Sequence, residues 1–187
     1  MRIIAGHLKG RRLDGPTWDG LRPTSDSLRE TLFNVLGPTL DGASVLDAYA
    51  GTGAVGLEAL SRGAARVTFI ERDPRAVTLI RQHVAKCGVD DAAVIIHDDF
   101  TRVCAADRHA ALGRFDLVFL DPPYDEGMTD RLLALARTVV TDRGRVVIEH
   151  SRRAVTPEAA GGLARRRVVT AGDSALSFYA PAASAAP

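Results

Sequence analysis

Residues 46–56 read Leu-Asp-Ala-Tyr-Ala-Gly-Thr-Gly-Ala-Val-Gly, and this stretch decides the fold. Gly51, Gly53 and Gly56 match the G-x-G-x-x-G pattern, in which a tight turn joins a buried strand to a helix whose N-terminus faces a ligand. An apolar run precedes the glycines and a helical pattern follows them. The segment therefore predicts the first strand–loop–helix unit of an α/β domain that binds an adenosine-type cofactor.

Short apolar runs alternate with helical patterns on both sides of this loop. The predicted strands, rich in Val, Ile, Leu and Phe, cover residues 44–48, 66–71, 92–97, 115–121 and 145–150. The predicted helices cover residues 54–62, 74–86, 100–108 and 129–138. Strands that alternate with helices indicate right-handed βαβ units, so we predict a Rossmann-like α/β fold with a mostly parallel, doubly wound sheet.

Three segments lie outside this alternation. Residues 2–5 and 11–13 predict a small basic β-hairpin at the N-terminus. Residues 25–36 predict a helix that begins at a Ser or Asp cap. Residues 164–170 and 175–180 flank the turn signal Gly-Asp and predict a C-terminal antiparallel hairpin.

The domain organisation follows from these segments. We expect a basic arm over residues 1–20, one cofactor-binding domain over residues 21–180 and a disordered Ala/Pro tail over residues 181–187. No linker separates a second domain that could hold a reducible substrate.

The composition excludes several classes of protein. The chain has 187 residues, of which 46% are hydrophobic and 25% charged, as in a globular domain with a core. No apolar run is long enough to span a bilayer, and the apolar stretch at the start is too short for a signal peptide. Two cysteines form no disulfide framework. We therefore expect a cytoplasmic protein.

The charge is balanced overall, with 24 Lys and Arg against 23 Asp and Glu, but it is unevenly distributed. Residues 1–12 contain Arg2, Lys9, Arg11 and Arg12 and no acidic residue. A basic arm of this kind suits docking on a polyanion such as RNA, although a solvated N-terminus has the same charge pattern.

Acidic residues at strand ends indicate which cofactor is bound. Glu71 follows Gly51 by twenty residues, where it can accept hydrogen bonds from ribose hydroxyls. Asp47 directly precedes the glycine loop, where a carboxylate attracts a cationic or amine-bearing ligand and repels a pyrophosphate. This favours S-adenosylmethionine over a dinucleotide. The candidate cofactor-binding residues are Asp47, Ala48, Gly51, Thr52, Gly53, Glu71, Arg72, Asp98, Asp99 and Phe100.

The fourth predicted strand ends in Asp121-Pro122-Pro123-Tyr124. The Asp121 carboxylate and the Pro122 carbonyl can each accept one N–H of an exocyclic amine, while Tyr124 stacks on its heterocycle. Holding that nitrogen toward a sulfonium methyl favours in-line displacement. If the two prolines served only to end the strand, neither the acid before them nor the aromatic ring after them would be needed. We therefore predict that Asp121, Pro122 and Tyr124 are catalytic, without a metal, and leave open whether Asp121 removes a proton or orients the amine.

Together these motifs resemble a known family. D-P-P-Y combined with D-x-x-x-G-x-G is typical of class I, S-adenosylmethionine-dependent methyltransferases that act on amino groups. The segments R-I-I-A-G, L-R-P-T, R-E-T-L-F-N and A-G-T-G-A-V-G-L-E-A-L-S-R-G begin at residues 2, 21, 29 and 50 and are similar to the RsmD family. The resemblance covers residues 2–150 and the C-terminal hairpin.

The resemblance implies an activity and a substrate. It implies methyl transfer from S-adenosylmethionine to the exocyclic N2 of one guanine in a loop of bacterial 16S ribosomal RNA, within a small ribosomal subunit. Asp121, Pro122 and Tyr124 would hold the guanine. The expected RNA-binding residues are Arg2, Lys9, Arg11, Arg12, Arg22, Thr24 and Arg29. We further expect a monomer.

Other functions stay open on the residues alone. A nicotinamide-dependent oxidoreductase would share the glycine loop and Glu71, but it leaves residues 121–124 unexplained. A non-catalytic ribosome-assembly factor would keep the fold and the basic arm. D-P-P-Y by itself also allows adenine, cytosine or glutamine as the methyl acceptor.

Overall fold

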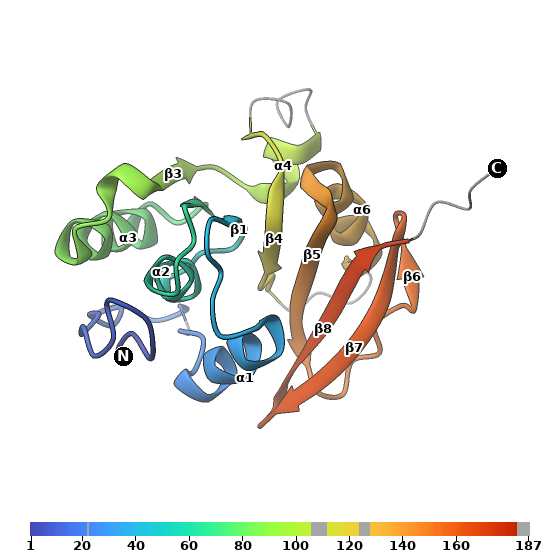
Figure 1. Cartoon of the computed structure of the whole chain (residues 1–187), viewed down its shortest axis with the longest axis horizontal. Coiled ribbons are helices and arrows are strands. Elements are labelled where there is room, and N and C mark those ends of the chain that lie inside the picture. The colour runs from blue at the N-terminus through green and yellow to red at the C-terminus, as the bar shows by residue number, and fades with distance from the viewer. Residues whose placement is uncertain (22, 106–111, 124–127, 183–187) are drawn as a thin grey trace. The chain divides into compact units, whose positions relative to one another are not determined.

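The structure is a computed structural model that describes residues 1–21, 23–105, 112–123 and 128–182. The chain forms two compact units, Met1–Phe100 and Thr101–Pro187, and each is described by itself (Figure 1). Arg22 and Tyr124, two of the predicted site residues, lie outside the described residues.

The first unit contains three parallel strands in the order β3-β2-β1. Helix α1 (Asp26–Leu36) precedes the strands, α2 (Ala54–Ser61) and α3 (Pro74–Cys87) connect them, and the short 3₁₀ helix η1 (Asp90–Ala92) leads into the last one. The strands are β1 (Ser44–Asp47), β2 (Arg66–Glu71) and β3 (Ala93–His97). The predicted strands and helices of this unit are confirmed to within one residue at each end.

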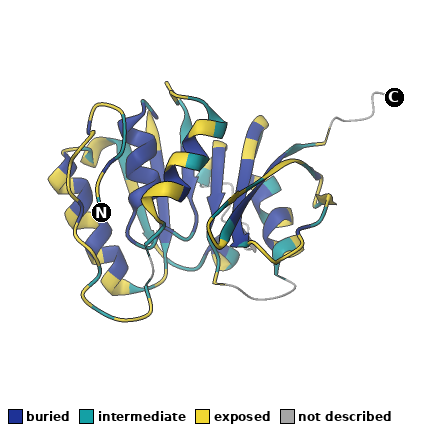
Figure 2. Cartoon of the chain, turned by 90° about the horizontal axis from the view of Figure 1, so that it is seen from below, coloured by how far each residue is buried: buried dark blue, intermediate teal, exposed yellow. Residues whose placement is uncertain are grey.

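Local sequence signals explain where these helices begin and end. The Ser25 side chain accepts a hydrogen bond from the Leu28 amide, and the Asp73 side chain accepts one from the Arg75 amide, so each caps a helix N-terminus. Pro74 occupies the first turn of α3, and Gly88 ends that helix with a φ of 68°. Strands β1 and β2 are buried along most of their length, β3 is half-buried to exposed, and α3 alternates buried and exposed positions (Figure 2).

Close packing of α2 on β2 depends on Gly56. A Cβ atom at this position would lie 2.3 Å from Cε1 of Phe69 and 2.8 Å from Cγ1 of Val67. The third glycine of the loop therefore lets the helix approach the strand, which is the role that the G-x-G-x-x-G pattern gives it. Every residue of α2 is buried.

The N-terminal arm forms an antiparallel pair, as predicted, but it is limited to a single bridge between Arg2 and Arg12. Two backbone hydrogen bonds of 2.9 Å flank the bridge, from the Ile3 amide to the Arg11 carbonyl and from the Gly10 amide to the Ile3 carbonyl. Ile3 is fully buried, which anchors the arm in the core of the unit.

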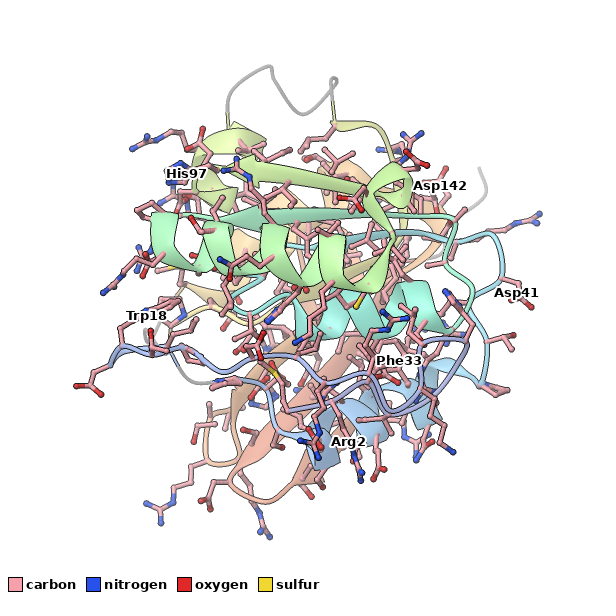
Figure 3. All side chains as sticks on the ribbon, turned by 90° about the vertical axis from the view of Figure 1, so that its left-hand side faces the viewer. Arg2, Trp18, Phe33, Asp41, His97 and Asp142 are labelled. Atoms are coloured by element: carbon pink, nitrogen blue, oxygen red, sulfur yellow. The ribbon has the colours of Figure 1, made fainter. Side chains whose placement is uncertain are left out.

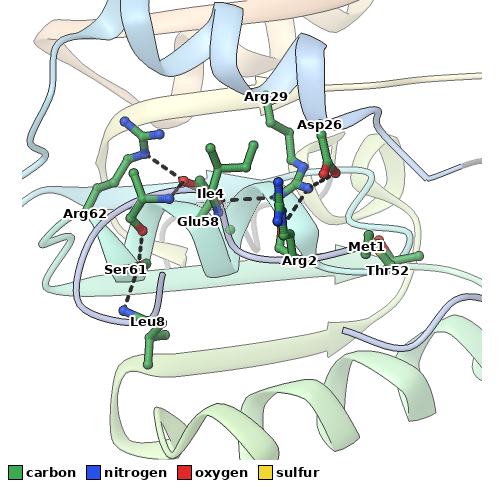
Figure 4. A network of polar contacts seen from close by, with 12 residues as sticks. Met1, Arg2, Ile4, Leu8, Asp26, Arg29, Thr52, Glu58, Ser61 and Arg62 are labelled. Carbon is green, nitrogen blue, oxygen red and sulfur yellow. Dashed lines mark hydrogen bonds and ion pairs between the residues drawn. The ribbon is translucent and has the colours of Figure 1, made fainter. Parts of the chain in front are cut away.

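A buried carboxylate on α2 holds this arm (Figure 4). The two carboxylate oxygens of Glu58 accept hydrogen bonds from the backbone amides of Ile4 and Ala5, at 2.8 and 2.9 Å. Its charge is balanced by Arg62 at 2.9 Å and by Arg29 at 3.4 Å. Because every oxygen of the buried acid has partners, the desolvation cost of the charge is offset.

The second unit has the strand order β4-β5-β8-β7-β6. Strands β4 (Phe115–Leu120) and β5 (Val140–Ser151) are parallel, whereas β8 (Ser174–Pro181) runs antiparallel to β5 and to β7 (Leu163–Ala171). A two-residue strand, β6 (Ala159–Ala160), ends the order, and helices α4 (Phe100–Ala105) and α6 (Thr129–Val139) complete the elements. The predicted C-terminal hairpin is thus confirmed, as is the mostly parallel sheet that precedes it.

Some predicted boundaries in this unit were wrong. Strand β5 begins at Val140, five residues before the predicted start, because Val140 pairs with Phe115 and a bulge around Gly144 restores the register at Arg145. Strand β8 continues through Pro181, the first residue of the segment predicted to be a tail. The end of the predicted helix over residues 100–108 and residues 183–187 lie outside the described residues. Among the described helices, none is long and apolar enough to cross a membrane.

Replacing Gly56 with Ala tests the helix–strand contact. The added methyl group would overlap the Phe69 ring, so we expect Gly56→Ala to lower the free energy of unfolding by about 1–3 kcal/mol. Urea unfolding followed by circular dichroism measures this change. Gly15→Ala is the matched control, because nothing lies within 4 Å of a Cβ there, and it should change stability by less than about 0.5 kcal/mol. Equal effects of the two substitutions would contradict the packing argument.

Candidate functional site

The glycine loop at the end of β1 is tied to the end of β2 by Glu71. One oxygen of the Glu71 carboxylate accepts a hydrogen bond from the Gly51 amide and the other accepts one from the Asp73 amide, both at 2.8 Å. Gly51 and Gly53 have φ values of 54° and 75°, which favour glycine. The half-buried Glu71 thus lies at the loop where the sequence predicted it, with its carboxylate fixed by backbone donors.

Asp47 lies beneath the same loop and is 1% exposed. Its Oδ2 accepts a hydrogen bond from the Gly56 amide at 2.9 Å, in the first turn of α2. The pKa of Asp47 is raised to about 7, mainly by burial; the hydrogen bond from the Gly56 amide opposes the shift, and the nearby charge of Glu71 adds to it. Among the described residues, only backbone amides form hydrogen bonds with the Asp47 and Glu71 carboxyl groups, so the pair suits a cationic ligand.

The loop after β3 supplies the third group of predicted residues. The Asp98 carboxylate accepts a hydrogen bond from the Asp99 amide at 2.8 Å, and both residues are half-buried. Phe100 is 1% exposed and packs edge-on against the ring of Tyr49, with the ring centroids 5.9 Å apart. Because Tyr49 belongs to the glycine loop, this contact joins the loops after β1 and β3.

Three predicted cofactor residues serve the structure in other ways. Thr52 is buried, its hydroxyl donates to Sδ of Met1 and its carbonyl bonds to Nδ1 of His83. Ala48 is 1% exposed. The Arg72 carbonyl bonds to Nε2 of His97, a residue labelled in Figure 3, while the Arg72 side chain is exposed. The described surface at these loops therefore includes Gly51, Glu71, Asp98 and Tyr49. Tyr49 is half-buried and was not among the predicted site residues.

The segment that follows the arm lies against the glycine loop. Cδ1 of Leu21 is 3.3 Å from the position that a Cβ of Gly51 would occupy. Trp18 in the same segment, labelled in Figure 3, stacks with the Arg75 guanidinium at 5.2 Å from its ring centroid. Because Gly51 has no side chain, Leu21 can pack against the edge of the glycine loop.

The predicted RNA-binding residues divide into two sets. Arg2, Lys9, Arg11 and Arg12 are exposed on the arm, and Arg11 also donates to the Lys86 carbonyl at 2.6 Å. Thr24 is half-buried. Arg29, by contrast, is fully buried and bonds to Asp26, to Glu58 and to the Arg2 carbonyl. The prediction that Arg29 contacts RNA is corrected, because its guanidinium is occupied in stabilising the arm.

In the second unit, the acceptor motif follows β4. Asp121 and Pro122 are half-buried and Pro123 is exposed. Asp121 hydrogen-bonds to Glu149, a 7% exposed acid in β5 that also hydrogen-bonds to Ser174. Burial raises the pKa of Glu149. The sequence analysis missed this residue, although an acid next to the apolar run Val-Val-Ile was a visible signal.

Comparisons with known proteins agree with this geometry. Residues 1–180 match the family model described as "Conserved hypothetical protein 95". "Ribosomal RNA small subunit methyltransferase D" from Escherichia coli (strain K12) is 33% identical over 181 residues, which are 96% of this chain and 89% of that protein. The protein of that name from Haemophilus influenzae is 40% identical over 139 residues, covering 72% of this chain and 69% of its own length. This chain belongs to the RsmD family.

Other RsmD-like proteins extend the likeness over the whole length. "Putative rRNA methyltransferase YlbH" from Bacillus subtilis (strain 168) is 36% identical over 184 residues, covering 96% of this chain and 98% of its own. The solved structure "Putative methyltransferase yhhF from Escherichia coli" has a TM-score of 0.83 at 34% identity and covers 98% of both chains. The fold is that of class I methyltransferases, and the chain is a methyltransferase.

The raised pKa of Asp47 predicts how stability depends on pH. The folded protein binds the Asp47 proton more tightly than the unfolded chain, whose pKa is near 3.8. The stabilisation is therefore complete below about pH 4 and is lost as the pH rises to about 7, at up to about 1 kcal/mol per pH unit. Asp47→Asn, which keeps an acceptor for the Gly56 amide, should remove this part of the slope.

Urea unfolding of the cofactor-free protein at pH 4.5, 6 and 7.5 measures the slope. Asp19→Asn is the matched control, because it removes a carboxylate at an exposed position, and it should keep the wild-type slope. An Asp47→Asn variant with an unchanged slope would show that Asp47 is ionised in the folded protein over the whole range.

Proposed function

We propose that this RsmD-family chain transfers a methyl group from S-adenosylmethionine to the exocyclic N2 of a guanine in 16S ribosomal RNA. The proposal rests on the Asp121-Pro122 pair at the end of β4. The chain that carries this pair is 40% identical to one protein named ribosomal RNA small subunit methyltransferase D and 33% identical to another. An acid and a fixed carbonyl suit an amine with two N–H donors.

The residues of the glycine loop fit S-adenosylmethionine. Glu71, at the end of β2, would accept hydrogen bonds from ribose hydroxyls. Asp47 lies beneath the loop with a pKa raised to about 7, so a bound sulfonium or ammonium group would favour its ionised form, whereas a pyrophosphate would oppose it. Asp98 would accept a hydrogen bond from the adenine amino group, with Phe100 beside the adenine face, while the Asp99 amide donates to the Asp98 carboxylate. When bound, the cofactor supplies an electrophilic methyl group.

The protein's own contribution to the transfer is to position the amine. The lone pair of an aromatic amine is delocalised into the ring, so the nitrogen is a poor nucleophile. If the Asp121 carboxylate and the Pro122 carbonyl each accept one N–H, the nitrogen is held in one orientation and its pyramidal form is favoured. Orientation of this kind supplies much of the rate acceleration in a displacement.

The exposed arm is proposed to bind the RNA. Arg2, Lys9, Arg11 and Arg12 project from a segment that Glu58 fixes to the body through backbone hydrogen bonds. Such a patch would contact phosphates, whereas the guanine itself would be unstacked and stack on Tyr124. We propose that the protein acts as a cytoplasmic monomer, with the RNA in a partly or fully assembled small subunit.

The test is transfer of tritium from methyl-labelled S-adenosylmethionine to small subunits that lack this modification. We expect wild-type protein to label 16S RNA, and Asp121→Ala to lower the rate by at least about 100-fold while the cofactor still binds. Asp116→Ala removes an exposed acid of β4 as a control and should keep the wild-type rate. Labelling that is unchanged in Asp121→Ala would contradict the assigned chemistry.

The same experiment separates the rival functions. NADH oxidation without methyl transfer would support an oxidoreductase. RNA binding without methyl transfer by the wild-type protein would support a non-catalytic assembly factor. Either result would overturn the proposed function.

The arm makes a separate prediction about salt. Lys9 and Arg12 are exposed, so replacing both with Gln should remove up to two phosphate contacts. The slope of log K against log salt for RNA binding should then fall by about 1–2. The control replaces two exposed arginines of the second unit, Arg131 and Arg143, with Gln and should leave the slope as in the wild type. Equal slopes for both variants would show that the arm makes no phosphate contact.

A further inference from the structure

Glu149 is a buried acid that the chemistry described so far does not use. It follows Val146, Val147 and Ile148 in β5, all at most 1% exposed, and is itself 7% exposed. Its Oε2 is a buried oxygen with no hydrogen-bond partner among the described residues. An acid this deeply buried needs compensation, and within the described part of the chain the side chains that interact with it are Ser174 and Asp121, neither of them basic.

The two groups that hydrogen-bond to Glu149 come from neighbouring strands. Asp121 follows β4, whose last residue Leu120 pairs with Ile148 of β5, so the two acids lie side by side at the ends of parallel strands. Ser174 begins β8 on the other side of β5 and offers a neutral hydroxyl. The next residue, His150, is engaged with Ser177 on β8. Among the described residues, Asp121 is therefore the titratable side chain that interacts with Glu149.

A hydrogen bond between two carboxyl groups requires a proton between them, because two carboxylates only accept. The pair therefore carries one proton and one negative charge. Glu149 is buried and Asp121 is half-buried, so desolvation favours the neutral form of Glu149 and leaves the charge on Asp121. The protonated Glu149 then donates to the Asp121 carboxylate.

We propose that Glu149 is a positioning residue of the acceptor site, which holds Asp121 through a shared proton and fixes the direction in which the Asp121 carboxylate accepts an amine N–H. The inference rests on the proposed function, since it concerns the same acceptor motif. It also addresses the question that the sequence left open: Asp121 orients the amine during methyl transfer, and the pair receives the proton only after the transfer.

The pair also provides a destination for the proton released in the reaction. The amine nitrogen forms its bond to the methyl carbon as the carbon–sulfur bond breaks, and the bonding electrons remain on sulfur. The methylated nitrogen then carries an extra proton and a positive charge. That proton passes to the Asp121–Glu149 pair, which goes from one proton to two and becomes neutral, and is afterwards released to water.

Two substitutions of Glu149 separate a proton-donating role from other roles. Glu149→Gln keeps a donor toward Asp121, so we expect its kcat to stay within about 3-fold of the wild type. Glu149→Leu removes the donor, and we expect kcat to fall by about 100-fold with little change in the KM for S-adenosylmethionine. Glu158→Gln makes the same change at a 93% exposed glutamate of the same unit and should have no effect. Thermal unfolding of each variant checks that it is folded.

The pH profile and infrared spectrum test the shared proton directly. Wild-type activity should fall at alkaline pH as the pair loses its proton, and Glu149→Gln should lack this loss because an amide does not titrate. At neutral pH, the infrared difference spectrum of wild type minus Glu149→Gln should contain a carboxylic-acid band, and that of wild type minus Glu158→Gln should not. The subtraction removes the band of Asp47, whose pKa is also raised.

The outcomes are distinct. Any of three results would overturn the inference: Glu149→Gln as inactive as Glu149→Leu, Glu149→Leu as active as the wild type, or no acid band in the difference between wild type and Glu149→Gln. A wild-type protein that shows the band but transfers no methyl group to 16S RNA would overturn the proposed function and leave the shared proton established.

Discussion

The hydrogen bonds between buried carboxylates and backbone amides at α2 are the constraint on which the first unit depends. Asp47 accepts from the Gly56 amide beneath the glycine loop, and Glu71 accepts from the Gly51 amide at its edge. Glu58, farther along the same helix, holds the N-terminal arm through two amides. One buried helix thus fixes both the glycine loop, which we propose binds the cofactor, and the proposed RNA-binding arm.

The buried acids differ in how their charge is compensated. This difference distinguishes an acid that stabilises the fold from acids that are candidates for function. Glu58 faces two arginines, so its charge is balanced within the protein. Asp47 faces another acid, and Glu149 shares hydrogen bonds with an acid and a hydroxyl. Burial without a basic partner is costly for stability and is typical of groups that meet a ligand or a reacting atom. Both uncompensated acids belong to the motifs from which methyl transfer is proposed.

The sequence predicted the parallel core well because its strands are buried on both faces and read as continuous apolar runs. It predicted the loop glycines for a similar reason, since left-handed backbone at Gly51 and Gly53 restricts the residue type. The early start of β5 could not be predicted, because Thr141 to Gly144 reads as a turn and pairs only through a bulge. Arg29 was misassigned because an arginine in a predicted amphipathic helix is normally exposed, and its partners Glu58 and Arg2 are distant in sequence.

The most direct test of the account is mass mapping of the nucleosides of 16S RNA after incubation of unmodified small subunits with wild-type protein and deuteromethyl-labelled S-adenosylmethionine. The account predicts one labelled nucleoside, N2-methylguanosine, at a single position, and none with Asp121→Ala. A label on adenosine, on cytidine or on ribose, or the absence of any label with the wild-type protein, would contradict it.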